Sequence, residues 1–188
     1  MLTATYSLIA ISNEQSAIQR ILRKVQQSLQ SLRKNLQQID LPALNAIFEQ
    51  VTHFDMLCHA RKVERYLVPA IKAVTHAADD LLAELDLLSS SASMLLRSAG
   101  DAVGRRVADR EQLMETHSSL EQYCHKMSIR LAREESELFP LAQRVLSVEE
   151  WFAVAENFLS DDERTLTRRR RAPHYVVTQA SPNRFGIR

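Results

Sequence analysis

The chain has 188 residues, enough for one domain with a buried core, and its 24 basic and 23 acidic residues leave a formal net charge of +1 at neutral pH. Hydrophobic residues make up 45% and charged residues 25%, which excludes a disordered chain and matches a globular protein. With only 3 Gly and 5 Pro the sequence has little turn chemistry, so the fold class we expect is all-α.

Apolar residues recur at three- and four-residue steps near the N-terminus and predict a first amphipathic helix over residues 6–37. Asp40 is placed to cap the second helix, and Pro42 lies in its first turn. We expect this second helix to run to residue 68, because Pro69 removes a backbone donor and should break or bend it.

Two further long helices are predicted in the second half of the chain. The third covers residues 70–97 and is followed by a turn at Gly100 and Gly104. The fourth spans residues 105–139 and should stop at Pro140. Four long helices with short links are the pattern of an antiparallel up-and-down four-helix bundle.

A short fifth helix should follow the bundle. The sequence SVEEW places Ser147 three residues before Glu150 as a capping box, and the helix it starts is expected to end near Leu159. A homo-oligomer also fits the sequence, because three aromatic residues of this helix could cap their own bundle or a neighbour's: Trp151, Phe152 and Phe158.

The charge is unevenly distributed along the chain. Residues 164–188 hold seven of the 24 basic residues and no acidic one, so residues 1–163 carry 17 basic against 23 acidic side chains. We therefore divide the chain into a helical-bundle domain, residues 1–163, and an Arg-rich tail, residues 164–188, which lacks helical periodicity and should be flexible.

The tail could dock on the acidic domain. Nucleic acid is a further candidate partner, since guanidinium groups bind phosphates, through Arg168, Arg169, Arg170 and Arg171.

The cysteines and the hydropathy of the chain indicate the cellular compartment of the protein. Cys58 and Cys124 lack CxxC spacing and lie within predicted helices, which indicates packed thiols in a reducing environment. No run approaches the ~20 apolar residues that a membrane span requires, and the N-terminus has neither a basic start nor a small-residue cleavage site. We expect a cytoplasmic protein without a membrane span.

The ends of the second and fourth predicted helices are similar to each other. HARKVERYLVPAI, residues 59–71, and RLAREESELFPLA, residues 130–142, align without gaps. Three identities fall in this alignment: Glu64 with Glu135, Leu67 with Leu138, and Pro69 with Pro140. Because the match lies at equivalent ends of two helices, we expect two helix pairs related by a pseudo-twofold axis.

The segment EESELFPLAQRVLSVEEWFAVAENF, residues 134–158, resembles the hemerythrin-like HHE cation-binding domains, and a looser resemblance covers residues 6–159. Those domains are four-helix bundles that hold two iron atoms in the core. Their first and third helices each supply a His from an EH start, and their second and fourth each supply an HxxxE pair. The resemblance therefore implies a metal site at the centre of the predicted bundle.

Carried over by position, the family's ligands are only partly present. The resemblance implies that three ligand positions are retained: His59, His76 and Glu134. At the other three positions the ligand is substituted: by Gln15, Val63 and Arg130. Three groups are too few for a pair of iron atoms, each of which needs several nitrogen or oxygen ligands. Glu64, one residue beyond Val63, should face ~100° away round the helix.

The arginine at position 130 changes the expected chemistry. Its guanidinium stays protonated, cannot coordinate a metal, and repels a divalent ion in a low-dielectric interior. We predict that Arg130 takes over the electrostatic role of the metal and pairs with Glu134 one turn along the helix, while Gln15 and the two histidines satisfy the remaining donors and acceptors.

Two alternatives to this interpretation stay open from the sequence. The three retained groups, His59, His76 and Glu134, could hold a single metal ion completed by water or by Gln15. The pair of Arg130 and Glu134 could also be a solvated surface pair if the helix is rotated.

The function we expect is that of a hemerythrin-like domain with an eroded di-iron site, acting without catalysis as a regulatory or protein-interaction module. It would need no cofactor, and its protein partner is not specified by the sequence. The alternative is a protein that binds non-heme iron, or another divalent metal, to sense or handle O2, NO or peroxide, as the resemblance implies if a reduced ligand set suffices. In that case iron is the cofactor.

Overall fold

The computed structural model describes residues 2–34, 41–104 and 110–171, and within these ranges every regular element is helical, which confirms the all-α class. The α-helices are α1 (Leu2–Lys34), α2 (Leu41–His59), α3 (Val68–Val74), α4 (Asp79–Gly104), α5 (Arg110–Arg133), α6 (Phe139–Val145) and α7 (Val148–Arg171). Two π-helical turns, η2 (Val63–Leu67) and η3 (Glu134–Leu138), precede α3 and α6.

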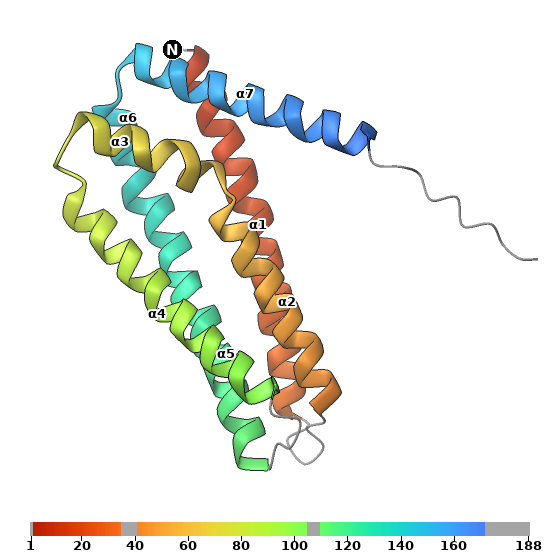
Figure 1. Ribbon diagram of the computed structural model, residues 1–188. Coiled ribbons are helices and arrows are strands. Elements are labelled where there is room, and N and C mark those ends of the chain that lie inside the picture. The colour runs from red at the N-terminus through yellow and green to blue at the C-terminus, as the bar shows by residue number, and fades with distance from the viewer. Residues whose placement is uncertain (1, 35–40, 105–109, 172–188) are drawn as a thin grey trace, which may run out of the picture.

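Four of the helices are long and lie side by side. Helices α1, α2, α4 and α5 contact one another and run along the length of the molecule, while α3, α6 and α7 gather at one end, where the N-terminus also lies (Figure 1). Asp40, the predicted cap of α2, lies outside the described residues.

The predicted internal repeat is visible as repeated local structure. In each copy a five-residue π turn leads into a seven-residue α-helix, and the two copies are offset by the same number of residues as the aligned sequences. Helices α3 and α6 also contact each other. The copies differ just upstream, because α5 continues directly into η3 whereas α2 stops at His59 and the chain bends before η2 (Figure 1).

Neither Pro69 nor Pro140 ends a helix. The predicted stop at Pro140 is therefore wrong, and at Pro69, where a break or a bend was expected, there is no break. Each is the second residue of a helix, α3 or α6, and the residue before it closes the π turn by donating its backbone N–H to the carbonyl five residues back. When a π turn returns to α pairing, a residue without an N–H can be accommodated without breaking the helix.

The predicted second helix is interrupted earlier, after His59, and a further break lies at residues 75–78, inside the predicted third helix. Thr75 is extended, with φ −155° and ψ 146°, and its Oγ1 accepts a hydrogen bond of 3.1 Å from the Ala77 amide. Asp79 and Asp80 then begin α4, where carboxylates suit the positive end of the helix dipole.

Gly100 was predicted to mark a turn but lies inside α4. A Cβ at this position would lie 3.1 Å from Cζ of Phe48, so the glycine allows an aromatic ring to approach the helix closely. Gly104 is the last residue of α4.

Helix α7 begins as predicted and ends later than predicted. The capping box is present: the Ser147 amide donates to Glu150 Oε2 at 2.6 Å, and the Glu150 amide donates to Ser147 Oγ at 3.2 Å. The helix continues through Arg171 instead of ending near Leu159, so the boundary predicted between residues 163 and 164 falls within it. Residues 172–188 of the predicted tail lie outside the described residues.

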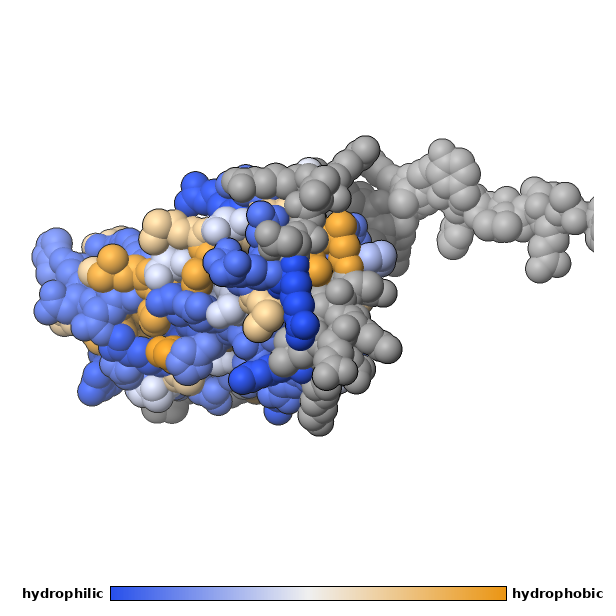
Figure 2. Space-filling view, turned by 90° about the horizontal axis from the view of Figure 1, so that it is seen from below, coloured by the Kyte–Doolittle hydropathy of each residue, from blue (hydrophilic) through white to orange (hydrophobic). Residues whose placement is uncertain are grey.

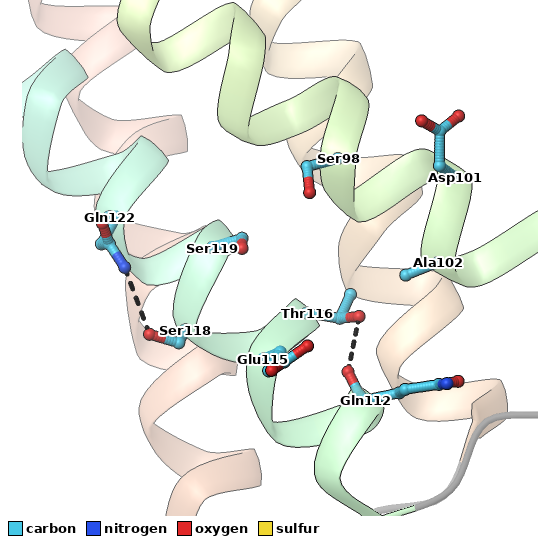
Figure 3. Close-up of a pocket in the computed structure, with 9 residues that line it drawn as sticks. All are labelled: Ser98, Asp101, Ala102, Gln112, Glu115, Thr116, Ser118, Ser119 and Gln122. Atoms are coloured by element: carbon cyan, nitrogen blue, oxygen red, sulfur yellow. Dashed lines mark hydrogen bonds between the residues drawn. The ribbon is translucent and has the colours of Figure 1, made fainter.

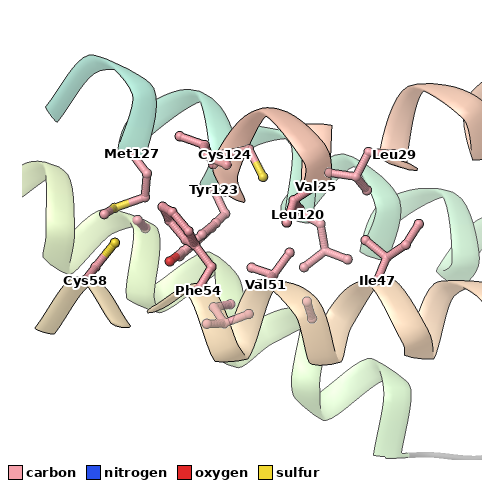
Figure 4. Close-up of a cluster of buried hydrophobic side chains, with 14 of the residues drawn as sticks. Val25, Leu29, Ile47, Val51, Phe54, Cys58, Leu120, Tyr123, Cys124 and Met127 are labelled. Atoms are coloured by element: carbon pink, nitrogen blue, oxygen red, sulfur yellow. The ribbon is translucent and has the colours of Figure 1, made fainter. Parts of the chain in front are cut away.

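The apolar core has two parts. One cluster, drawn in part in Figure 4, lies among α1, α2, α4 and α5, and includes the edge-to-face pair of Phe54 and Tyr123 with ring centroids 6.2 Å apart. The other lies towards the end where α3, α6 and α7 gather and includes Trp151 and Phe158. Seen from the opposite end, most of the described surface is hydrophilic, with apolar residues scattered among it (Figure 2). No described helix is long and apolar enough to cross a membrane.

Candidate functional site: a buried polar layer

Between the two apolar clusters lies a set of buried and half-buried polar side chains, which we call the polar layer. It draws on α1, the α2–η2 segment, α4 and the α5–η3 segment. Its members are Gln15, Arg61, Glu64, Ser89, Arg130 and Glu134.

Sequence position explains why the layer divides the core. On α1, Gln15 lies between Ile11 of one apolar cluster and Ile18 of the other. On the α5–η3 segment, Glu134 lies between Leu131 and Leu138 in the same way. These residues follow the three- and four-residue steps of a buried helix face, so the polar groups occupy positions at which apolar side chains would be expected.

Arg61 is the centre of the layer and is 1% exposed. It binds the carboxylate of Glu134 in a bidentate pair, with Nη1 to Oε2 at 2.6 Å and Nη2 to Oε1 at 2.8 Å. It also donates to Gln15 Oε1 at 2.9 Å, to Glu64 Oε1 at 3.0 Å and to the Cys58 carbonyl at 3.1 Å. Because a guanidinium has five N–H groups, this buried cation has a partner for each.

Glu134 is fully buried and is shared by two arginines. In addition to the pair with Arg61, Oε1 accepts a hydrogen bond of 3.0 Å from Nε of Arg130. The nitrogen Nη2 of Arg130 donates to Glu64, and its Nη1 donates to Ser89. Two arginines and two glutamates therefore neutralise one another inside the protein, which is the condition for burying charge without a large desolvation loss.

Gln15 ties the layer to the backbone of a neighbouring helix. Its Oε1 accepts from Arg61, and its Nε2 donates to the Leu131 carbonyl at 2.8 Å. Leu131 lies in the last turn of α5, where carbonyl groups begin to lose their regular α-helical partners because the π turn follows. The amide side chain thus links α1, Arg61 and α5.

Burial and pairing act in opposite directions on the titratable groups here. Burial alone would lower the pKa of Arg61, but the hydrogen bonds and the charge of Glu134 outweigh it and raise that pKa above its usual value. Burial raises the pKa of the Cys58 thiol to about 12, with the charge of Arg61 opposing the rise. The layer therefore holds a permanent cation beside a thiol that stays protonated at neutral pH.

The predicted pair of Arg130 and Glu134 is present in the core. Arg130 is 5% exposed and Glu134 is 0% exposed, so the alternative of a solvated surface pair is wrong. Gln15 also lies in the polar layer, as predicted.

The two histidines are not in the layer, contrary to the prediction. The side chain of His59 is 61% exposed, with Nε2 3.6 Å from Asp55 Oδ2, because Cys58 takes the inward position on α2 and its neighbour is turned about 100° away. The side chain of His76 is 96% exposed and lies in the link before α4, where Nδ1 is 2.9 Å from Asp79 Oδ2.

Val63 agrees with its expected status as a substituted ligand position, whereas its neighbour Glu64 differs from expectation. Val63 is buried in the apolar cluster that includes Leu138, so it packs rather than binds. Glu64, expected to face away, accepts hydrogen bonds from both Arg61 and Arg130. The chain bends between α2 and η2, and the bend rotates the segment that carries Glu64. The expected direction of Glu64 was therefore wrong, because it assumed one straight helix.

Arg61 was missed by sequence reasoning, although a signal for it exists. The buried row of α2 contains Val51, Phe54 and Cys58, and one further step of three residues falls on Arg61. A basic residue at the end of an apolar row is normally interpreted as a solvated helix end, and only the carboxylate from a distant part of the chain makes burial favourable here.

The structure also has a polar hollow of about 490 Å³ between the ends of α4 and α5, away from the layer (Figure 3). Helix α4 contributes Ser98 and Asp101, and α5 contributes Glu115 and Ser119. No histidine is among the described residues that line it, so its serines have no imidazole base beside them. This arrangement suggests no particular chemistry.

The residues present do not fit the iron pair that the resemblance implies. The one core carboxylate of the retained set, Glu134, already binds two arginines, and the two histidines point into solvent. Within the described ranges there is no group of three His, Cys, Asp or Glu side chains that could hold a metal ion. No protein family, curated protein or solved structure matches the chain in sequence or fold comparisons.

Proposed function

We propose that the protein is a hemerythrin-like antiparallel four-helix bundle of the cytoplasm in which the polar layer takes the place of a di-iron site, and that it acts as a non-enzymatic regulatory or protein-interaction module. The observation that carries this proposal is the saturation of Glu134: both of its oxygens accept hydrogen bonds from Arg61, and one accepts a third from Arg130. A carboxylate engaged in this way has little capacity left for a metal ion.

Charge supports the same interpretation. Arg61 and Arg130 place two fixed positive charges around the position that a divalent ion would share with Glu134. Repulsion from such charges is strong where water is excluded, so binding of iron would require the arginines to leave the core. The layer then has a structural role, because it joins the long helices at one level. Interaction with a partner would take place at the protein surface.

Metal analysis of the purified protein tests this proposal. After expression in iron-supplemented medium, we expect sub-stoichiometric iron, no iron charge-transfer band in the optical spectrum, and no difference between the wild-type chain and a His59→Ala variant. The matched control is Arg61→Gln, which removes one cation from the layer while keeping hydrogen-bonding capacity. Near-stoichiometric iron in the wild type that is lost in His59→Ala would overturn the proposal in favour of a metal-binding sensor.

A further inference from the structure

Helix α7 carries an outward row of large apolar side chains. Trp151 and Phe158 pack into the core, whereas Val148, Phe152 and Leu159 are 56%, 60% and 52% exposed. The three exposed residues are spaced by four and seven positions, so they lie on one strip of the helix. An aligned row of exposed apolar residues differs from the scattered ones normal on a protein surface and indicates a contact surface.

Acidic residues flank this row. Glu149 and Glu156, seven residues apart, are exposed on the same side of α7, and neither forms an ion pair with another described residue. Negative charge beside the row disfavours an anionic membrane or a nucleic-acid backbone as the partner. The surface instead fits a partner that combines apolar and basic side chains.

The protein itself carries such a surface on α1. A shallow hollow of about 630 Å³ is flanked by Arg20, Arg23 and Lys24, with the partly buried Ala17 and Ile21 between them. The three basic residues are exposed and form no ion pair with another described residue. Apolar atoms edged by cations are the complement of the α7 row.

We propose that the outward row of α7 in one copy docks on the α1 hollow of a second copy. Because α7 already packs on α1 of its own chain through its buried face, and the row stays exposed there, the partner must be another molecule (Figure 1). Each copy carries both surfaces, so a two-fold pair forms the contact twice. This contact deepens the proposed interaction role by naming a second copy of the chain as the partner.

Sedimentation of the full chain over a concentration series tests the contact. We expect reversible self-association that weakens as ionic strength rises, because the charged rim is screened by salt. Replacing Phe152 and Leu159 by Ser should raise the dissociation constant at least about tenfold. The matched control is Leu87→Ser on α4, which removes a leucine outside the row that is even more exposed than Leu159 and should leave the dissociation constant unchanged.

Charge reversal identifies the partner. Glu156→Arg and Arg23→Glu should each weaken association of the pure variant, because both contacts then join like charges. An equimolar mixture of the two should regain association, because both contacts of the mixed pair join opposite charges. A chain that stays monomeric throughout, or surface variants that associate like the wild type, would overturn the proposal. These variants leave the polar layer intact, so their failure is distinguishable from failure of the metal analysis.

Discussion

Arg130 and Arg133 lie one turn apart on α5 and make the same kind of contacts in different surroundings. Each pairs with a glutamate four residues along the chain and with a second glutamate from another segment: Arg130 with Glu134 and Glu64, and Arg133 with Glu137 and Glu84. Arg130 lies in the core, whereas the group around Arg133 is open to water. The comparison shows that contact geometry alone does not reveal what an ion pair contributes.

Burial decides the energetic difference between the two sites. At the surface, water solvates either partner when the other is removed, so an ion pair contributes little. In the core, removal of one partner leaves a charge that neither water nor protein stabilises. Hydrogen bonds from Arg133 still lower the pKa of Glu137, but this carboxylate would remain solvated without them.

The largest effect is expected for Arg61→Ala. This change leaves Glu134 with a single arginine, takes a donor from Gln15 and opens a cavity, so we expect the free energy of unfolding to fall by about 3 to 5 kcal/mol. Chemical denaturation measures it. The matched control is Arg133→Ala, which removes the same type of side chain from the exposed group and should change stability far less. Equal losses of stability in the two variants would contradict the distinction between the buried and the exposed ion pairs.

Arg130→Ala should have an intermediate effect. If Arg130 were the sole partner of Glu134, its loss would strand a buried charge, but Arg61 keeps that carboxylate paired. We therefore expect a loss of about 1 to 3 kcal/mol in the free energy of unfolding, from the hydrogen bonds of Arg130 and its packing. A loss as large as that of Arg61→Ala would mean that the two arginines share the role equally.

The buried thiols provide a pH-dependent test of the apolar part of the core. Burial raises the pKa of Cys58 and of Cys124 from the ordinary 9.0 to about 12. The folded state therefore keeps both protons where the unfolded chain releases them, so the stability they contribute is complete below pH 9.0 and is lost as pH rises towards about 12. When the free energy of unfolding is measured at successive pH values, the double variant with Cys58→Ala and Cys124→Ala should lose less stability at alkaline pH than the wild type does. Parallel declines would show that the thiols are not buried.

The smallest effect is expected at the exposed histidines. His59→Ala and His76→Ala remove side chains that are mostly in solvent, so neither should shift the denaturation midpoint measurably. A marked loss of stability in either variant, matched in the wild type by addition of a metal chelator, would place these residues at a site that the structure does not show.

The sequence predicted features that depend on neighbours along the chain. The capping box of Ser147 and Glu150 and the pair of Arg130 with Glu134 require only residues three or four positions apart, and both are present. The repeated segment was also found correctly, since a gapless alignment detects it.

Features that depend on distant segments were not predictable in the same way. Arg61 is buried because Glu134 meets it from 73 residues away, and helical periodicity holds no information on that pairing. His59 was placed by carrying over a family position, whereas Cys58 takes the inward position on α2 and leaves its neighbour exposed. Pro69 was expected to break or bend a helix and Pro140 to stop one, because a π turn, which accommodates each, has no clear signature in a single sequence.

Arg61 and Glu134 are coupled directly through their bidentate ion pair, and a double-mutant cycle measures that coupling. Arg61→Ala, Glu134→Ala and the double variant would be compared with the wild type by chemical denaturation. We predict that the double variant is more stable than the sum of the single losses implies, with a coupling energy of about 2 kcal/mol or more, because no unpaired partner of this bond is left behind. Losses that add to within about 0.5 kcal/mol would contradict the central claim that these two charges hold the layer together.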